Sequence, residues 1–138
     1  MKHLLALALA LALGVTATAC SDSTSPGASI AGTYSLQTIN GQPLPVVVNS
    51  SGSPYSEVLS SQISLGVDGD YNSLTRYRDT YPGGQPNLVD VRATGFWTLS
   101  GSQITLTEIG YPNDPSYGTI SGNRITFVDF GFTLVYTR

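Results

Sequence analysis

The side chains that could do chemistry in this chain are few, and their positions exclude several mechanisms. The only histidine is His3 and the only cysteine is Cys20. His3 lies directly before an apolar N-terminal run and Cys20 shortly after it, so the rest of the chain offers neither imidazole nor thiol. This excludes Ser-His-Asp and Cys-His catalysis and zinc sites built from nitrogen and sulfur ligands. Carboxylate, tyrosine, serine and arginine chemistry remains.

One acidic stretch has the spacing of a calcium loop. Residues 68–72, DGDYN, follow the D-x-D-x-N pattern, and Asp79 comes eleven residues after Asp68. A calcium loop of this type requires glycine at its sixth position, and Ser73 stands there. The same residues also form a turn signal followed by a strand signal. We therefore favour a plain β-turn and expect no metal site.

Carboxylates could also act as an acid and base pair in glycoside cleavage, which needs two of them at a defined separation. The candidates are Asp68 with Asp70, and Asp90 with Glu108. Nothing in the sequence sets their separation, and solvated charges on turns and strand faces are the commoner role for such residues. We expect no catalytic residues and no cofactor, and therefore a protein that is not an enzyme.

The arginines and aromatic residues offer binding rather than catalysis. Arg76, Arg78 and Arg92 fall on neighbouring expected strands, where they could form a surface ladder with Asp90. Alternatively, Arg92 could point inward and hold an anionic ligand. Aromatic residues either form the core or line a pocket, and a buried tyrosine hydroxyl needs a polar partner. The candidate ligand-binding residues are Tyr34, Tyr77, Arg92, Trp97 and Tyr136.

The elements that must position these side chains are β-strands. After residue 29 the chain alternates apolar and polar residues with period two, and turn residues separate the runs. Residues 71, 73, 75 and 77 share one expected strand face, and Gly95 predicts a bulge or bend. About eight strands joined by short links, without a helix, predict an all-β fold. We expect a single small antiparallel up-and-down β-barrel over residues 30–138.

An internal repeat supports the hairpin arrangement. Residues 98–106 read TLSGSQITL and residues 119–127 read TISGNRITF. Both follow the frame T-[LI]-S-G-[SN]-x-I-T-[LF], with a Ser-Gly turn between two β-rich runs. Glycine supplies the positive φ that a tight hairpin turn needs. We interpret the repeat as two hairpins of one architecture rather than as a shared active site.

The chain opens with MKHLLALALALALGVTATAC. A basic start, an apolar run and small residues in that order predict a secretory signal peptide. The apolar run is too short for a membrane span, which takes about 20 residues. Residues 17–20, ATAC, resemble the lipobox of bacterial lipoproteins. This resemblance implies cleavage before Cys20 and acylation of its thiol, and thus attachment to a membrane. Residues 1–19 would be the signal peptide, and residues 20–29 a lipidated cysteine and flexible linker.

A second resemblance concerns the start of the expected barrel. Gly32-Thr33-Tyr34 resembles the Gly-x-Trp element of lipocalin-like (calycin) domains, with tyrosine in the place of tryptophan. The resemblance implies a small barrel that holds one ligand.

Ser21 after the lipobox implies the outer membrane if the host is Gram-negative, and in any case a location in the cell envelope.

The charge balance bears on possible partners. The chain has six basic and nine acidic residues and a formal net charge of −3. Since no basic cluster could follow a phosphate backbone, we expect no nucleic acid partner. We expect a membrane-anchored binding module for a small apolar or amphipathic molecule. The alternative is a filled barrel that binds or inhibits another envelope protein.

Overall fold

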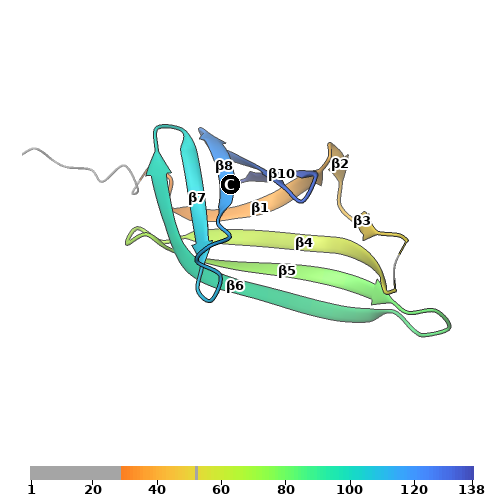
Figure 1. Cartoon of the computed structure of the whole chain (residues 1–138). Helices are drawn as coiled ribbons and strands as arrows, with labels where there is room; N and C mark the ends of the chain where they lie inside the picture. The colour runs from red at the N-terminus through yellow and green to blue at the C-terminus, as the bar shows by residue number, and fades with distance from the viewer. Residues whose placement is uncertain (1–28, 52) are drawn as a thin grey trace, which may run out of the picture.

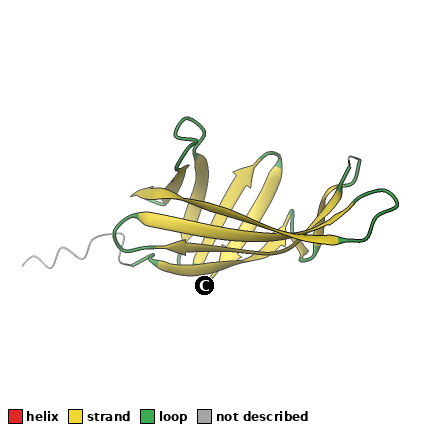
Figure 2. Cartoon of the chain, turned by 90° about the horizontal axis from the view of Figure 1, so that it is seen from below, coloured by secondary structure: helices red, strands yellow, loops and turns green. Residues whose placement is uncertain are grey.

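A computed structural model describes residues 29–51 and 53–138. Figure 2 shows that the ordered elements are strands joined by loops. The expected signal peptide, Cys20 and the linker up to residue 28 lie outside the described residues. Within those described, no helix is long and apolar enough to cross a lipid bilayer.

Eight strands of the described chain form a closed barrel, and two short ones lie beside it. The short strands are β2 (Gln42–Pro43) and β3 (Val46–Asn49). The barrel strands are β1 (Gly32–Ile39), β4 (Tyr55–Leu65), β5 (Asp70–Thr80), β6 (Asn87–Ser100), β7 (Gln103–Glu108), β8 (Ser116–Ser121), β9 (Arg124–Asp129) and β10 (Phe132–Thr137).

The barrel closes because β1 pairs with two other barrel strands. One ladder joins it to β4, with Gly32 opposite Leu65, and another joins it to β10, with Leu36 opposite Tyr136. Each remaining strand pairs antiparallel with its neighbour in sequence. A closed ladder leaves no unpaired barrel edge. The predicted all-β antiparallel barrel is confirmed, and it is the architecture that the lipocalin-like resemblance implies.

Local sequence explains the individual strands and turns. Alternation turns Tyr71, Ser73, Thr75 and Tyr77 of β5 toward the interior, where all four line hollows of the barrel. The two Ser-Gly turns of the repeat have glycine at positive φ, 61° at Gly101 and 58° at Gly122. The repeat therefore forms two equivalent hairpins, β6–β7 and β8–β9.

The predicted irregularity at Gly95 is not a bulge. The β5–β6 and β6–β7 ladders pass through it in unbroken register. β6 curves upward in Figure 1 as it passes from one ladder to the other. What glycine provides is close approach, since a Cβ there would lie 2.0 Å from the Thr107 carbonyl oxygen and 2.7 Å from Tyr71 Cε1. The register shifts of the described strands fall elsewhere, in β1, β3 and β4.

Strand direction defines two ends of the barrel. At the closed end lie the first described residue, Ser29, the β4–β5 turn at 66–69, and the glycine turns at 101 and 122. At the open end lie the loops at 81–86 and 109–115 and the turns at 40–41 and 130–131. The β5–β6 hairpin extends beyond the rest of the barrel there (Figure 1).

The closed end is packed with large apolar side chains. Tyr34, Ile104 and Ile125 are 0% exposed, and Trp97, Leu106 and Phe127 are buried around them. Their burial supplies the main stabilisation of the fold, at about 25 cal/mol per Å² of apolar surface. Gly118 faces Phe127 so closely that a Cβ would lie 2.7 Å from its ring.

Hydrogen bonds seal the closed end. The Arg138 guanidinium donates to the carbonyl oxygens of Ser29 and Ala31, at 2.8 and 2.7 Å, and stacks 5.4 Å from the centre of the Tyr34 ring. The Tyr34 hydroxyl donates to the Ile30 carbonyl oxygen at 2.8 Å, and Trp97 Nε1 donates to that of Gly66 at 3.0 Å. The described chain therefore begins at an end of the barrel that several hydrogen bonds hold in place.

Candidate functional site

The open end of the barrel contains a cavity of about 560 Å³. A smaller hollow of about 170 Å³ lies deeper, toward the closed end, and six residues line both spaces. These shared residues are Ser61, Thr75, Glu108, Asp129, Leu134 and Tyr136. The larger volume lies within the range of small-molecule sites. Toward the mouth the wall is apolar, with Leu36, Ile39, Val48, Val58, Tyr77, Val91, Phe130 and Phe132.

A buried hydroxyl network crosses the middle of the barrel. Ser61 is 3% exposed, and its hydroxyl shares hydrogen bonds with Thr75 Oγ1 at 2.7 Å and with the Tyr136 hydroxyl at 3.1 Å. The Tyr136 ring meets Phe127 edge to face, with the ring centres 6.0 Å apart. Burial raises the pKa of the Tyr136 hydroxyl, so this group stays protonated and offers a neutral polar surface to the cavity.

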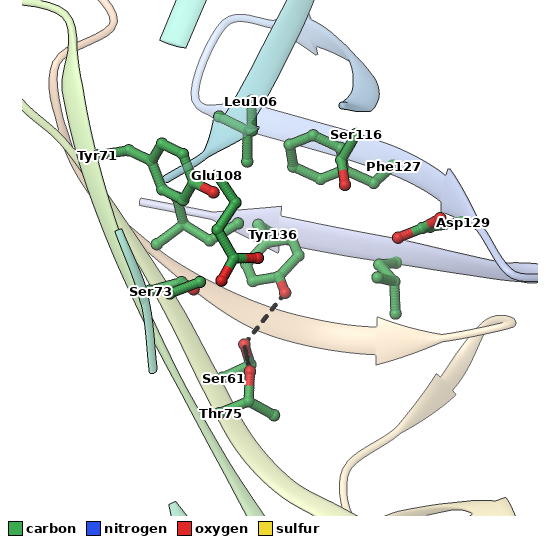
Figure 3. A pocket seen from close by; sticks show the side chains of 13 residues that line it. Ser61, Tyr71, Ser73, Thr75, Leu106, Glu108, Ser116, Phe127, Asp129 and Tyr136 are labelled. Carbon is green, nitrogen blue, oxygen red and sulfur yellow. Dashed lines mark hydrogen bonds between the residues drawn. The ribbon is translucent and has the colours of Figure 1, made fainter. Parts of the chain in front are cut away.

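Two carboxylates belong to the cavity wall. Glu108 ends β7 and Asp129 ends β9, and Figure 3 shows them on either side of the Tyr136 ring. Among the described residues neither carboxylate belongs to an ion pair, because the two salt bridges there involve Glu57 and Asp90. Burial raises the pKa of Tyr71, and the negative charge of Glu108 raises it further. The cavity is thus amphipathic, because apolar side chains, hydroxyl groups and two carboxylates all line it.

Phe130 stands at the rim of the cavity in an unusual conformation. It is 86% exposed and has a φ of 46°, and Gly131 follows at 82°. The turn between β1 and β2 has the same pattern, with Asn40 at 51° and Gly41 at 78°. Asparagine suits positive φ, whereas a bulky residue there is strained. A large apolar side chain that is both strained and exposed favours neither stability nor solubility.

The structure separates the five predicted ligand-binding residues. Tyr77 and Tyr136 line the cavity. Tyr34 and Trp97 belong to the packed closed end. Arg92 is exposed on the outer face, since its strand neighbours Val91 and Ala93 line the interior. The alternative in which Arg92 points inward is therefore wrong for this structure.

The predicted surface ladder of arginines with Asp90 is present only in part, because Arg76 bonds Asp90 whereas Arg78 bonds Glu57 on the other neighbouring strand. Arg76 donates two hydrogen bonds to Asp90, at 2.7 and 2.8 Å. Arg78 donates one to Glu57 at 2.7 Å. These bonds with arginine lower the pKa of Asp90 and of Glu57. Such exposed pairs contribute little to stability, since water screens them.

Neither carboxylate pair considered from sequence meets in the cavity, since Glu108 is the only one of the four that lines it. Asp90 is on the outer face and Glu108 in the cavity, so the wall of the barrel lies between them. Asp68 is exposed in the β4–β5 turn at the closed end, and the side chain of Asp70 lies over Gly66. Over residues 29–51 and 53–138 no group of three or more histidine, cysteine or acidic residues could hold a metal ion.

Sequence reasoning missed Asp129 as a second carboxylate in the cavity wall, although the internal repeat carries a signal for both Glu108 and Asp129. Two residues beyond the repeated frame, TLSGSQITL continues with Thr-Glu and TISGNRITF continues with Val-Asp. Glu108 and Asp129 therefore hold equivalent positions in the two hairpins. Both are in phase with the buried residues before them, Leu106 and Phe127. Period two sends such residues to the interior.

Comparison with known proteins supplies no functional information for this chain, so a functional proposal rests on the geometry of the site. No protein family model matches this chain. A search of curated protein sequences finds no significant match.

Proposed function

We propose that this domain binds a small amphipathic molecule inside the open half of the barrel, without transforming it. The cavity of about 560 Å³ is the observation that carries the proposal. A barrel that served only as a rigid support would gain stability from filling this space, because buried apolar contacts are what hold such a fold together. The cavity thus favours a ligand over the alternative of a completely filled barrel.

The lining sets the kind of ligand. Aliphatic and aromatic side chains at the mouth accept an apolar group, and the hydroxyls of Ser61, Thr75 and Tyr136 offer hydrogen bonds deeper inside. A few polar groups within a largely apolar cavity is the usual design of a small-molecule site. Phe130 at the rim would cover the apolar part of a bound molecule.

We further propose that Cys20 anchors the chain to a membrane of the cell envelope. Ser29 is bonded to Arg138 at the closed end, so a linker from Cys20 would join the barrel there. The mouth, at the opposite end, would then face away from the membrane. In this arrangement the ligand enters from the aqueous side rather than from the bilayer to which the protein is attached.

Native mass spectrometry tests the binding function. The chain would carry Cys20→Ser, so that no attached lipid competes for the cavity, and would be isolated gently from the envelope fraction. We expect a stoichiometric extra mass that disappears on denaturation. A clean apo mass that persists after incubation with envelope extract would contradict the proposal.

A matched pair of variants shows where the molecule binds. Val91 lies on the inner wall of the mouth and is 50% exposed, whereas Val128 lies on the outer face. Val91→Trp would fill the mouth, so we expect the extra mass to be lost. Val128→Trp makes the same change outside and should retain it. Equal retention by both variants would place the ligand elsewhere on the protein.

A further inference from the structure

The charge of the cavity wall has one sign. Glu108 and Asp129 both line the cavity, whereas the arginines of the described chain all lie elsewhere. The described residues contain no lysine or histidine. A molecule in the cavity therefore meets negative groups without a positive one among the residues that the structure describes.

Each arginine is held away from the interior. Arg76 and Arg78 are in ion pairs on the outer face. Arg138 is bonded at the closed end, and Arg92 and Arg124 are exposed. An arginine on the outer face of a closed barrel cannot reach inside without breaking the ladder. An anionic headgroup in the cavity would consequently have no basic partner.

The two carboxylates are themselves short of partners. In the part of the chain that the structure describes, neither Glu108 nor Asp129 belongs to an ion pair. They are partly exposed in a cavity whose wall toward the mouth is apolar. A cation that enters would form charge-assisted hydrogen bonds with them, which are the strongest polar contacts available there.

The rest of the lining fits an organic cation better than a metal ion. Calcium takes about six to eight oxygen ligands, and β8 separates the two strands that carry the carboxylates. The rings of Tyr77, Phe132 and Tyr136 line the same cavity. Aromatic faces attract ammonium and guanidinium groups, and the aliphatic side chains near the mouth would take an apolar tail.

We propose that the ligand is an amphipathic organic cation, whose ammonium or guanidinium group is attracted by the carboxylates of Glu108 and Asp129 while its apolar part lies among the apolar side chains of the cavity. This inference rests on the proposed function, because it names the ligand class of the same cavity. It implies that binding weakens as salt concentration rises, since ions screen the attraction.

Three probes with the same apolar tail test the sign of the charge. Octylamine is cationic at neutral pH, octanol is neutral and octanoate is anionic. Each would be titrated against the Cys20→Ser chain by calorimetry at low salt. We expect octylamine to bind at least tenfold more tightly than octanol, because a charged hydrogen bond is worth about 1.5–3 kcal/mol. Octanoate should bind most weakly.

Two substitutions locate the contact. Glu108→Gln and Asp129→Asn keep the shape of each side chain but remove its charge, and each should weaken octylamine binding about tenfold. Octanol binding should be unchanged in both. Asp68→Asn is the control, because it removes an equal charge from the exposed turn at the closed end. If one cavity variant fails to fold, the other still decides the question.

The outcomes separate this inference from the function on which it rests. Octanol binding as tightly as octylamine, or octanoate binding best, would overturn the cationic ligand and leave a binding cavity intact. Octylamine binding that is insensitive to both cavity substitutions would overturn the role of Glu108 and Asp129. Failure of all three probes to bind would contradict the proposed function as well.

Discussion

The two halves of this barrel are built from the same strands and yet differ in what the strands place inside. In β7 the inward residues run from Ile104 through Leu106 to Glu108, from the closed to the open end. In β9 they run from Ile125 through Phe127 to Asp129. The first two of each set are buried apolar residues, and the last is a cavity carboxylate.

This difference separates the residues that hold the fold from those that are free to bind. The closed half is tightly packed around Gly118, where a Cβ would lie 2.7 Å from the Phe127 ring. The open half keeps space and polar groups that an apolar core would exclude. If the closed half alone supplies the stability, changes in the open half should alter binding while the barrel stays folded.

The largest contrast is expected between equivalent truncations in the two halves. Ile104 is fully buried, so Ile104→Ala should lower the free energy of unfolding by about 3 kcal/mol, through lost burial and the cavity left behind. Val91→Ala, at the half-exposed mouth, should change it by less than about 0.5 kcal/mol. Urea titration monitored by Trp97 fluorescence measures both. Equal losses in the free energy of unfolding would mean that the open half stabilises the fold as much as the closed half does.

A smaller effect is expected at the boundary between the halves. Ser61→Ala removes the hydroxyl that links Thr75 and Tyr136, leaving a buried tyrosine hydroxyl short of a partner. We expect a loss of about 2 kcal/mol in the free energy of unfolding. Ser73→Ala, on the same interior face, is the matched control and should cost less. If both substitutions lower the melting temperature by the same amount, the hydroxyl network has no structural role.

Phe130→Asn should move stability and binding in opposite directions. Asparagine tolerates the positive φ of this turn, so the variant should gain roughly 1 kcal/mol in the free energy of unfolding. It should bind octylamine less tightly, because the rim loses its apolar cover. Asn40→Phe makes the reverse change in the matching turn and should lose more stability than the Phe130 variant gains, because it also removes the hydrogen bond that Asn40 Oδ1 accepts from the Thr133 N–H. An unchanged affinity in the Phe130 variant would remove that residue from the site.

The last effect is confined to alkaline solution. Burial raises the pKa of Tyr34, Tyr71, Tyr77 and Tyr136 above 10.0. The unfolded chain releases these protons near pH 10.0, while the folded barrel retains them to higher pH. The free energy of unfolding should therefore fall as pH rises above 10.0, and thermal melting across that range measures it. A melting temperature that stays constant there would show that the phenols are not protected.

Much of the fold could be predicted from the sequence because it rests on local signals. Alternation placed Tyr71, Ser73, Thr75 and Tyr77 on one face of a strand, and the Ser-Gly turns of the repeat indicated two hairpins. Gly95 was harder, since a missing side chain predicts an irregularity without saying which kind. Close packing against Tyr71 and Thr107 became visible only when β5, β6 and β7 lay together.

The site could be predicted only in part. Tyr77 and Tyr136 were expected to line it and do, whereas Tyr34 and Trp97 are packed in the closed end. An aromatic residue carries the same sequence signal in a core as in a pocket. Which of the two it joins depends on how many neighbours surround it, and those neighbours come from distant strands.

The sequence by itself determined that residues 30–138 form alternating strands and tight turns, because side-chain period and glycine conformation are local properties. It also limited the available chemistry, since imidazole and thiol occur only at His3 and Cys20. Tertiary structure decided which strand face is the interior, because β1 closes the barrel by pairing with both β4 and β10. Closure also decided that one end fills and the other stays open, and so brought Glu108 and Asp129 to one cavity.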